Sequence, residues 1–237
     1  MTEALLKVRG LCAWYGRAQI LHGMDFEVGR GEVVGLMGRN GAGKSTTFKA
    51  LMGLLNRIEG DIRFGGESLR GREPYRIARA GLGYVPEDRR IYAGLNVMEN
   101  LEVGKQPPRP DAPHWTLEKL FRLFPNLDEL RERPGGQMSG GEQQMLTLAR
   151  TLMGNPTMVL LDEPSEGLAP KIVENMANAL LTLKREGLSV LLSEQNLHFA
   201  RLVCDRAYVI EKGKVRFAGS MAELEANEDL RRAELTL

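Results

Sequence analysis

The sequence has few of the residues that disulfide-bonded or metal-binding proteins require. Its 237 residues include two cysteines, Cys12 and Cys204, and three histidines, His22, His114 and His198. Because the cysteines are far apart in apolar surroundings, we expect two free core thiols in a reducing compartment. The histidines are scattered without metal-ligand spacing, so we expect them at the surface or at the edge of the core.

Long hydrophobic runs and an excess of one charge are also absent. No segment approaches the ~18 apolar residues that cross a bilayer, and the N-terminal MTEALLKVRG does not resemble a signal peptide. We therefore expect a cytoplasmic protein that only a partner could hold at a membrane. The 32 basic and 31 acidic residues leave a net charge of +1, which gives no support for a nucleic-acid partner.

The most informative stretch is the glycine-rich GRNGAGKST, residues 38–46. It follows the apolar run 32–37, which predicts a buried strand, and precedes 48–55, which has helical spacing. A strand, a glycine-rich turn and a helix start are typical of a loop that holds nucleotide phosphates. We expect Lys44 to reach the β and γ oxygens and Ser45 to coordinate Mg²⁺. The predicted nucleotide-binding residues here are Gly38, Arg39, Asn40, Gly41, Ala42, Gly43, Lys44, Ser45 and Thr46.

The apolar patterns on either side predict an α/β fold. Helical spacing dominates residues 88–156, apart from the proline-rich loop 106–113, so we expect a helical subdomain inserted into an α/β core of residues 1–87 and 157–237. Strands are predicted within 5–28 and over 60–66, 81–87, 157–164 and 188–195, and helices over 75–80, 171–186 and 197–204. A hairpin over 207–219 turns at Lys212-Gly213, and the residues from Met221 onward are helical.

Two acidic residues, Asp162 and Glu163, end the apolar run MVLL. Ligands of α/β sheets bind at the carboxyl ends of strands, so we expect this pair to face the phosphate loop from the end of a neighbouring strand. Asp162 would hold Mg²⁺ through its water shell, and Glu163 would orient and polarise the attacking water. The alternative is a helix cap before Pro164. Since phosphoryl transfer needs a metal ligand at this place, the phosphate loop favours the functional interpretation.

The segment MSGGEQQ, residues 138–144, predicts a second anion site. Ser139 can cap the helix that starts there, and Gly140 and Gly141 expose N–H groups at its positive end. A plain helix cap would explain Ser139 but not the paired glycines. The site lies in the helical segment, away from the phosphate loop.

These motifs, in this order and over essentially the whole chain, resemble the nucleotide-binding subunit of an ATP-binding cassette (ABC) transporter. GRNGAGKST is similar to the Walker A motif, MVLLDE to Walker B and MSGGEQ to the LSGGQ signature. The resemblance implies a mixed sheet, an N-terminal antiparallel β subdomain and the inserted helical subdomain. It also places Tyr15 against adenine, the alternative being a half-buried strand residue. It implies ATP and Mg²⁺ in a head-to-tail dimer, each ATP lying between one subunit's Walker motifs and the other's Ser139-Gly140-Gly141.

Within the family, the chain is most similar to the smaller ATP-binding subunit of branched-chain amino-acid importers. Three positions depart from the broader pattern: Glu87 replaces the glutamine that contacts Mg²⁺ and water, Gln195 the switch histidine, and Ala169 an aspartate. Glu87 can still ligate a metal, and Gln195 can donate a hydrogen bond to phosphate. Arg89, Arg90 and Tyr92 stand where the family's membrane subunit docks, although the arginines could equally form a solvated turn.

Two functions follow from this resemblance. One is an ATPase motor that powers import of branched-chain amino acids or a related solute such as urea, amides or aromatic acids. The other is a slow, mainly structural subunit beside a more active sibling ATPase. The implied partners are two membrane permease subunits, a sibling ATPase or second copy, and an extracytoplasmic solute-binding protein, with this chain peripheral on the inner face of the membrane. A soluble family member in translation or DNA repair is less favoured, because such proteins carry two cassettes or long coiled-coil insertions. The run 194–196 disfavours a lipopolysaccharide exporter.

Overall fold

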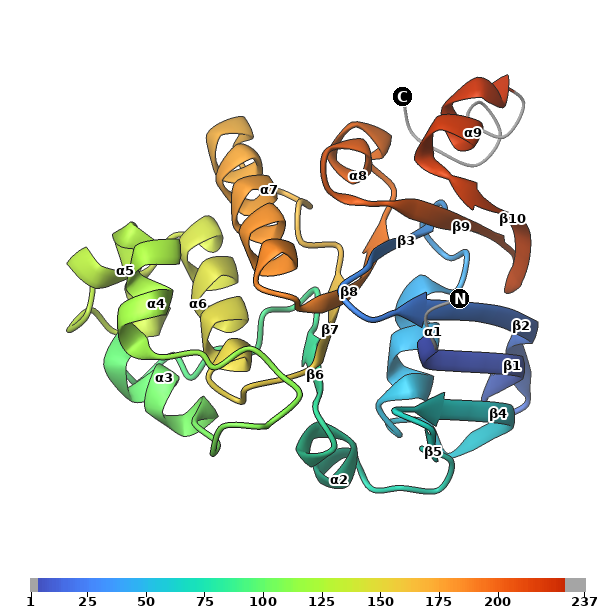
Figure 1. The fold of residues 1–237 in the computed structure, drawn as a ribbon, viewed down its shortest axis with the longest axis horizontal. Coiled ribbons are helices and arrows are strands. Elements are labelled where there is room, and N and C mark those ends of the chain that lie inside the picture. Colours follow the sequence, from blue (N-terminus) through green and yellow to red (C-terminus); the bar gives the residue numbers. More distant parts are fainter. Residues whose placement is uncertain (1–3, 229–237) are drawn as a thin grey trace.

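A six-stranded mixed sheet forms the centre of the protein, of which the computed structural model describes residues 4–228. The strands lie in the order β10-β9-β3-β8-β7-β6, and all neighbours are parallel except β10, which is antiparallel to β9 (Figure 1). Their bounds are β3 Val33–Met37, β6 Leu82–Val85, β7 Met158–Asp162, β8 Ser189–Glu194, β9 Arg206–Glu211 and β10 Lys214–Ser220.

The three central strands, β3, β7 and β8, are buried along their whole length because both faces of the sheet are covered. Successive side chains of a strand point to opposite faces. In β7, Met158 and Leu160 belong to the core shared with the N-terminal strands, whereas Val159 and Leu161 belong to the core shared with the helical segment. The continuous apolar run that predicts a buried strand is therefore explained by two separate cores.

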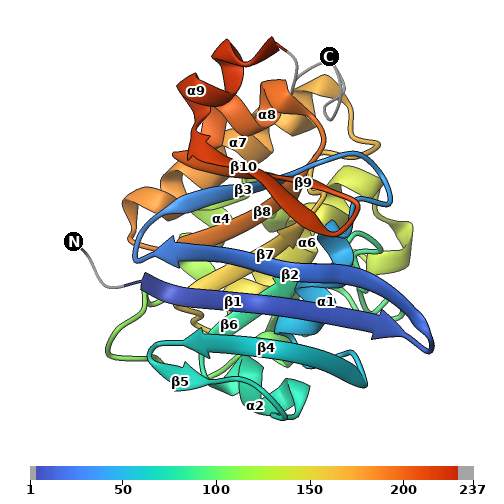
Figure 2. The ribbon, with the colours of Figure 1, turned by 90° about the vertical axis from the view of Figure 1, so that its right-hand side faces the viewer.

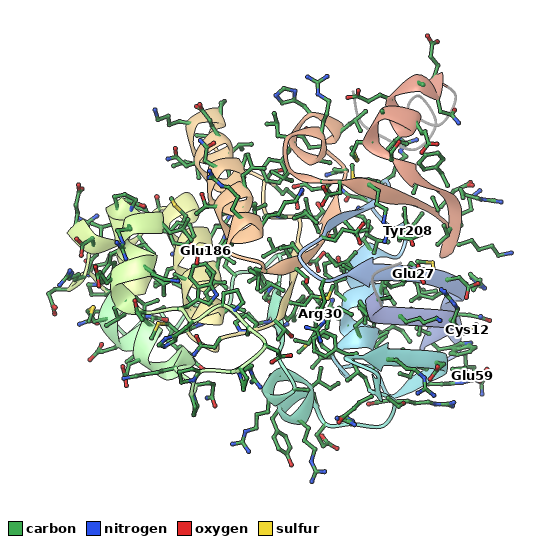
Figure 3. The ribbon with its side chains drawn as sticks, viewed as in Figure 1. Cys12, Glu27, Arg30, Glu59, Glu186 and Tyr208 are labelled. Atoms are coloured by element: carbon green, nitrogen blue, oxygen red, sulfur yellow. The ribbon has the colours of Figure 1, made fainter. Side chains whose placement is uncertain are left out.

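An antiparallel sheet of the N-terminal residues lies beside the central sheet, in the order β2-β1-β4-β5 (Figure 2). Its strands are β1 Ala4–Tyr15, β2 Ala18–Gly29, β4 Arg57–Phe64 and β5 Glu67–Ser68. The helix α1 (Lys44–Leu51) packs between the two sheets through side chains such as Phe48, which is fully buried. Tyr208 of β9 connects the sheets through hydrogen bonds of its hydroxyl with the backbone of Glu27 in β2 (Figure 3).

Helices cover the remaining face and one end of the central sheet. The segment 88–156 forms α3 Val97–Gly104, α4 Leu117–Leu123, α5 Pro125–Glu129, a 3-10 turn Gly135–Gln137 and α6 Gly140–Leu152. The other helices are α2 Pro74–Arg79, α7 Pro170–Arg185, α8 Leu197–Val203 and α9 Met221–Ala226. Among residues 4–228, none of the helices is both long and apolar enough to span a bilayer.

Most of the predicted elements are present, and their ends move by a few residues. The helix predicted over 48–55 begins at Lys44 and ends at Leu51, so that Leu54 is outside it and 43% exposed. The predicted turn at Lys212-Gly213 is confirmed, with left-handed φ angles of 46° and 73°. The helix expected from Met221 onward is confirmed as far as Ala226, and residues 229–237 lie outside the described part of the chain.

The predicted environments of the cysteines and histidines are confirmed only in part. Both thiols are free, as expected, but Cys12 and Cys204 are half-buried rather than core residues. Cys12 lies on a strand of the antiparallel sheet that has one exposed face, and Cys204 follows the last residue of α8. His22, His114 and His198 are all exposed.

Candidate functional site

The phosphate loop connects β3 to α1, and two of its glycines are required by space. A Cβ atom at Gly38 would lie 2.5 Å from the Ile210 carbonyl oxygen, and one at Gly43 would lie 2.8 Å from Leu21 Cδ2. Gly43 also has a φ of 114°, in a region that side chains rarely adopt. The loop is thus pressed against β9 and β2, and the glycine spacing follows from that packing as well as from the tight turn.

Lys44 is the first residue of α1 and is only 3% exposed. Its Nζ donates hydrogen bonds to the carbonyl oxygens of Gly38 (2.7 Å) and Arg39 (3.2 Å) and lies 3.0 Å from Glu163 Oε1. A lysine has three N–H donors, so all three have acceptors here. Binding a phosphate oxygen therefore requires Lys44 to give up at least one of these contacts.

Ser45, Asp162 and Glu87 bring oxygen atoms together beside Lys44. Ser45 Oγ lies 3.1 Å from Asp162 Oδ1 and 3.4 Å from Glu87 Oε2. The Tyr84 hydroxyl donates to Asp162 Oδ2 at 3.3 Å. Burial raises the pKa of Asp162, and hydrogen bonds from Ser193 and Ser45 partly oppose that rise. Burial and the charge of Asp162 also raise the pKa of Tyr84, which keeps its phenol protonated as a donor.

This oxygen set fits Mg²⁺, which is bound by one or two carboxylates and keeps several waters and substrate phosphates as its other ligands. Within residues 4–228, no group of three or more His, Cys, Asp and Glu side chains is placed to form an all-protein metal site. A hydroxyl and two carboxylates at the mouth of a phosphate loop are suited to a metal ion that arrives with a nucleotide.

Glu163 is held in a strained backbone conformation, with a φ of 47°. Such a conformation costs a residue other than glycine on the order of 1–3 kcal/mol and persists where the surrounding contacts fix it. Here the Glu163 N–H donates to both the carbonyl oxygen and the hydroxyl of Ser193, each at 3.1 Å. The carboxylate is thereby turned toward Lys44.

We expected the acidic pair at the end of a strand adjacent to the strand that leads into the phosphate loop, but the structure places another strand between them. Strand β8 lies between β3 and β7 and pairs with both. Its residue Ser193 fills the gap, since Ser193 Oγ donates to Asp162 Oδ1 at 2.6 Å. The expectation was wrong because the apolar pattern shows that a strand is buried but does not show which strands flank it.

A cleft of about 540 Å³ lies over the phosphate loop. Tyr15, 46% exposed, lines it together with Lys44 and Ser45. The remaining lining residues are Ile20, Asn40, Gly41, Gly43, Thr46, Glu87, Glu163 and Glu166. Glu166 was missed by the sequence reasoning, and a hydrogen bond with Glu163 raises its pKa.

Gln195 and Glu194 lie at the carboxyl end of β8. Gln195 is half-buried and is not among the residues that line the cleft. Glu194 is 1% exposed and accepts hydrogen bonds from the backbone N–H groups of Ser165, Gln195 and Asn196. Burial raises its pKa, against the hydrogen bonds from Ser165 and Asn196. The sequence offered a signal for Glu194, because a charged residue ends an apolar run there just as Asp162 does.

Ser139, Gly140 and Gly141 are not brought to the phosphate loop within this chain. Ser139 caps α6 as predicted, accepting from the Glu142 N–H while the Glu142 carboxylate accepts from the Ser139 N–H at 2.7 Å. It lines a separate cleft of about 840 Å³ between α4, α5, α6 and α7. The sequence could not show which side chains pack on the two glycines. A Cβ atom at Gly140 would lie 2.6 Å from Arg89 Nη1, and one at Gly141 2.8 Å from Ile172 Cγ2.

Comparison with known proteins agrees with this geometry. Residues 21–166 match the family model described as ABC transporter. The chain is 42% identical over 231 residues to BraG of Pseudomonas aeruginosa, a high-affinity branched-chain amino acid transport ATP-binding protein, covering 98% of this chain and 99% of that one. It is 32% identical over 234 residues to LptB of Haemophilus influenzae, a lipopolysaccharide export system ATP-binding protein, covering 98% and 97%.

Solved structures show the same fold. A crystal structure of the ADP conformation of an ATP-binding cassette from an ABC transporter superposes with a TM-score of 0.82 at 26% identity, covering 98% of each chain. A nucleotide-free cassette also gives a TM-score of 0.82, at 25% identity. With the family model spanning most of the chain and relatives aligned from end to end, the chain belongs to the ABC transporter family and is one of its ATPase subunits, which hydrolyse ATP to power transport.

Proposed function

We propose that the chain is the ATP-hydrolysing subunit of an importer for branched-chain amino acids or a related small polar solute. The observation that carries the proposal is the 42% identity to BraG over nearly the whole of both chains, against 32% for the lipopolysaccharide-export relative. The residues of the site support its ATP-hydrolysing part, since Lys44, Ser45, Asp162 and Glu163 lie together at the phosphate loop.

Three groups of this chain would act on the triphosphate. Lys44 would move from its carbonyl acceptors to the β and γ oxygens, and the N–H groups of residues 38–46 would bind the β-phosphate. Ser45, Asp162 and Glu87 would hold Mg²⁺, whose chemistry when bound is to neutralise phosphate charge.

Glu163 would orient the attacking water and polarise it toward the γ-phosphate. Its carboxylate is suited to this role because the strained backbone at φ 47° and the two hydrogen bonds from its N–H to Ser193 fix its position. The side chain also lines the cleft over the phosphate loop, where Tyr15 would stack on adenine.

The assembly that we propose is a head-to-tail pair of ATPase subunits, formed with a sibling or a second copy. Ser139, Gly140 and Gly141 would contact the γ-phosphate of the nucleotide held by the partner subunit. Their separation from the phosphate loop within one chain supports this arrangement, because Ser139 lines a cleft that shares no residue with that of Lys44. Two permease subunits would hold the pair at the inner face of the membrane, and an extracytoplasmic protein would supply the solute.

A second candidate function is a slow subunit whose nucleotide site is mainly structural. Gln195 favours it, because this residue stands outside the cleft and its amide cannot become cationic. Glu87 also favours it, since its carboxylate adds a second negative charge beside Asp162 at the metal position.

Transport by the assembled complex distinguishes these functions. The chain would be reconstituted in vesicles with its permease subunits and sibling ATPase, and uptake of labelled leucine would be measured with wild type and Glu163→Gln. The importer proposal predicts solute-binding-protein-dependent uptake that Glu163→Gln abolishes. Undiminished uptake would support the slow-subunit function, and no uptake of any amino acid, amide or urea by the wild-type complex would contradict import.

A further inference from the structure

Glu194 is a buried carboxylate without a cationic partner. It ends β8 and is 1% exposed, and among residues 4–228 no Lys, Arg or His forms an ion pair with it. A buried carboxyl group is costly unless hydrogen bonds satisfy its oxygens. The hydrogen bonds of the Glu194 carboxylate therefore indicate the role of this residue.

Both carboxylate oxygens of Glu194 accept backbone hydrogen bonds, and they do so from two different loops. Oε1 accepts from the N–H of Ser165 at 3.1 Å, in the loop that follows Glu163. Oε2 accepts from the N–H groups of Gln195 (3.2 Å) and Asn196 (3.1 Å), at the start of the loop after β8. The Glu194 side chain thus joins the loop after β7, which carries Glu163, to the loop after β8, which carries Gln195.

The backbone of the same residue reaches a third segment. The Glu194 carbonyl oxygen accepts from the N–H of Gly38 at 3.3 Å, where the phosphate loop begins. The preceding residue, Ser193, holds Asp162 and the N–H of Glu163. Since β8 lies between β3 and β7, the end of this strand contacts both the phosphate loop and the loop that follows β7.

We propose that Glu194 is a positioning residue that fixes the loops carrying Glu163 and Gln195 relative to the phosphate loop. It contacts no part of the triphosphate in this role and acts only through the segments that it joins. The inference rests on the proposed roles of Glu163 and Gln195 in hydrolysis. It adds a residue that the ABC motifs themselves do not include.

The chemistry of the side chain makes the proposal specific. A glutamine has the length of Glu194 but has one oxygen acceptor and one NH₂ donor. It could accept from the N–H of Ser165 or from those of the Gln195–Asn196 pair, but not from both, although an NH₂ turned toward Ser165 could still donate to the Ser165 hydroxyl. Glu194→Gln therefore releases one loop while leaving the volume of the buried side chain unchanged.

The test compares Glu194→Gln with wild type in the purified full-length chain, with ATP and Mg²⁺. We expect kcat to fall at least about tenfold, since small misplacement of catalytic groups has effects of this size. The Kd for ATP should change less than about threefold, because Lys44 and the phosphate-loop N–H groups are untouched. A matched control is Glu32→Gln, which removes a partly buried ion pair with Arg206. Because this pair lies at the end of the sheet away from the phosphate loop, its loss should lower the stability of the protein but not kcat.

Amide hydrogen exchange gives a readout that does not depend on activity. In wild type, the amides of Ser165, Gln195 and Asn196 should exchange slowly and gain protection together when ATP binds. Glu194→Gln should accelerate exchange in one of the two loops. Independent exchange of the two loops in wild type, or a kcat of Glu194→Gln within about twofold of wild type, would overturn the proposal. If Glu194→Gln does not fold, the wild-type exchange pattern alone decides.

The roles assigned to Glu163 and to Glu194 can fail separately. Hydrolysis that persists in Glu163→Gln would refute the role of Glu163 in the proposed function. The linked exchange of the two loops would still be present in that case, so the joining role of Glu194 would stand.

Discussion

Lys44 and Glu163 form an ion pair that is almost completely removed from water, with side-chain exposures of 3% and 6%. Taking two charges out of water is costly, and removing one partner leaves the other buried and unpaired. The pair therefore links the stability of the nucleotide-free protein directly to its catalytic groups.

Lys44→Ala should lower the free energy of unfolding by about 3 kcal/mol in the absence of nucleotide, because Glu163 loses its cation. Adding Glu163→Gln to Lys44→Ala should restore part of that loss, since the unpaired charge is then removed. Urea denaturation of the two single variants and the double variant measures the coupling. Purely additive effects would contradict the pairing.

Cys204 provides a second prediction at the scale of a single residue. Burial raises the pKa of its thiol, and the charges of Glu194 and Asp205 raise it further. Because only the thiolate reacts with iodoacetamide, Cys204 should remain unmodified at pH 8 in the native protein. Mass spectrometry after timed labelling measures this. The thiol should react once urea unfolds the chain, and rapid labelling of the native chain would contradict the raised pKa of the Cys204 thiol.

The ends of the strands show how far the sequence could predict the site. The apolar runs before Gly38 and Asp162 correctly predicted two buried strands with chemical groups at their carboxyl ends. The third strand, β8, was also predicted, but not that it lies between the other two. Strand order follows from which connections and cores fit together in space, and no local pattern records it. Ser193 and Glu194 were missed for that reason.

The segment that begins α6 at Ser139 shows a different limit of prediction from sequence. The cap at Ser139 was predictable because its pattern is local, a serine followed three residues later by a glutamate. The hydrogen bond from the Thr147 hydroxyl of α6 to the Arg89 carbonyl oxygen joins residues that are far apart in the sequence. Sequence spacing therefore located the element but not the side chains that pack on it.

The β9–β10 hairpin turn supports a prediction at the scale of an element. Gly213 accepts from the N–H of His22 and donates to the Ala42 carbonyl oxygen, so the turn joins β2 to the phosphate loop. A Cβ atom at Gly213 would lie 1.8 Å from the Ile20 carbonyl oxygen, whereas one at Gly187 would meet no atom within 4 Å. Both glycines have positive φ angles, of 73° and 89°.

Gly187→Ala should therefore cost about 1 kcal/mol, from backbone strain alone. Gly213→Ala should cost at least about 2 kcal/mol more, because the backbone of β2 must also shift. Urea denaturation of the two variants measures the difference. Equal destabilisation would contradict the close packing of the turn against β2.

At the scale of the whole molecule, the proposed sharing of each nucleotide between the phosphate loop of one chain and Ser139 of another predicts association that depends on ATP. In a Glu163→Gln background, which should retain ATP, light scattering should show the mass of two chains with ATP and of one chain without it. Ser139→Asp keeps a good helix cap but places a negative charge toward the partner's phosphate, so it should abolish the pair. Ser220→Asp changes the equivalent cap of α9 and is the matched control. A single-chain mass with ATP would contradict self-association.

In the proposed function, Glu163, held by Ser193 beside Lys44, activates water for ATP hydrolysis. The most direct measurement is the single-turnover rate of ATP hydrolysis by Glu163→Gln, made together with its Kd for ATP and with Glu211→Gln as a surface control. If Glu163 activates the water, the rate should fall at least about 100-fold, with a Kd within about threefold of wild type. A rate within about tenfold of wild type would show that Glu163 is not the group that activates water.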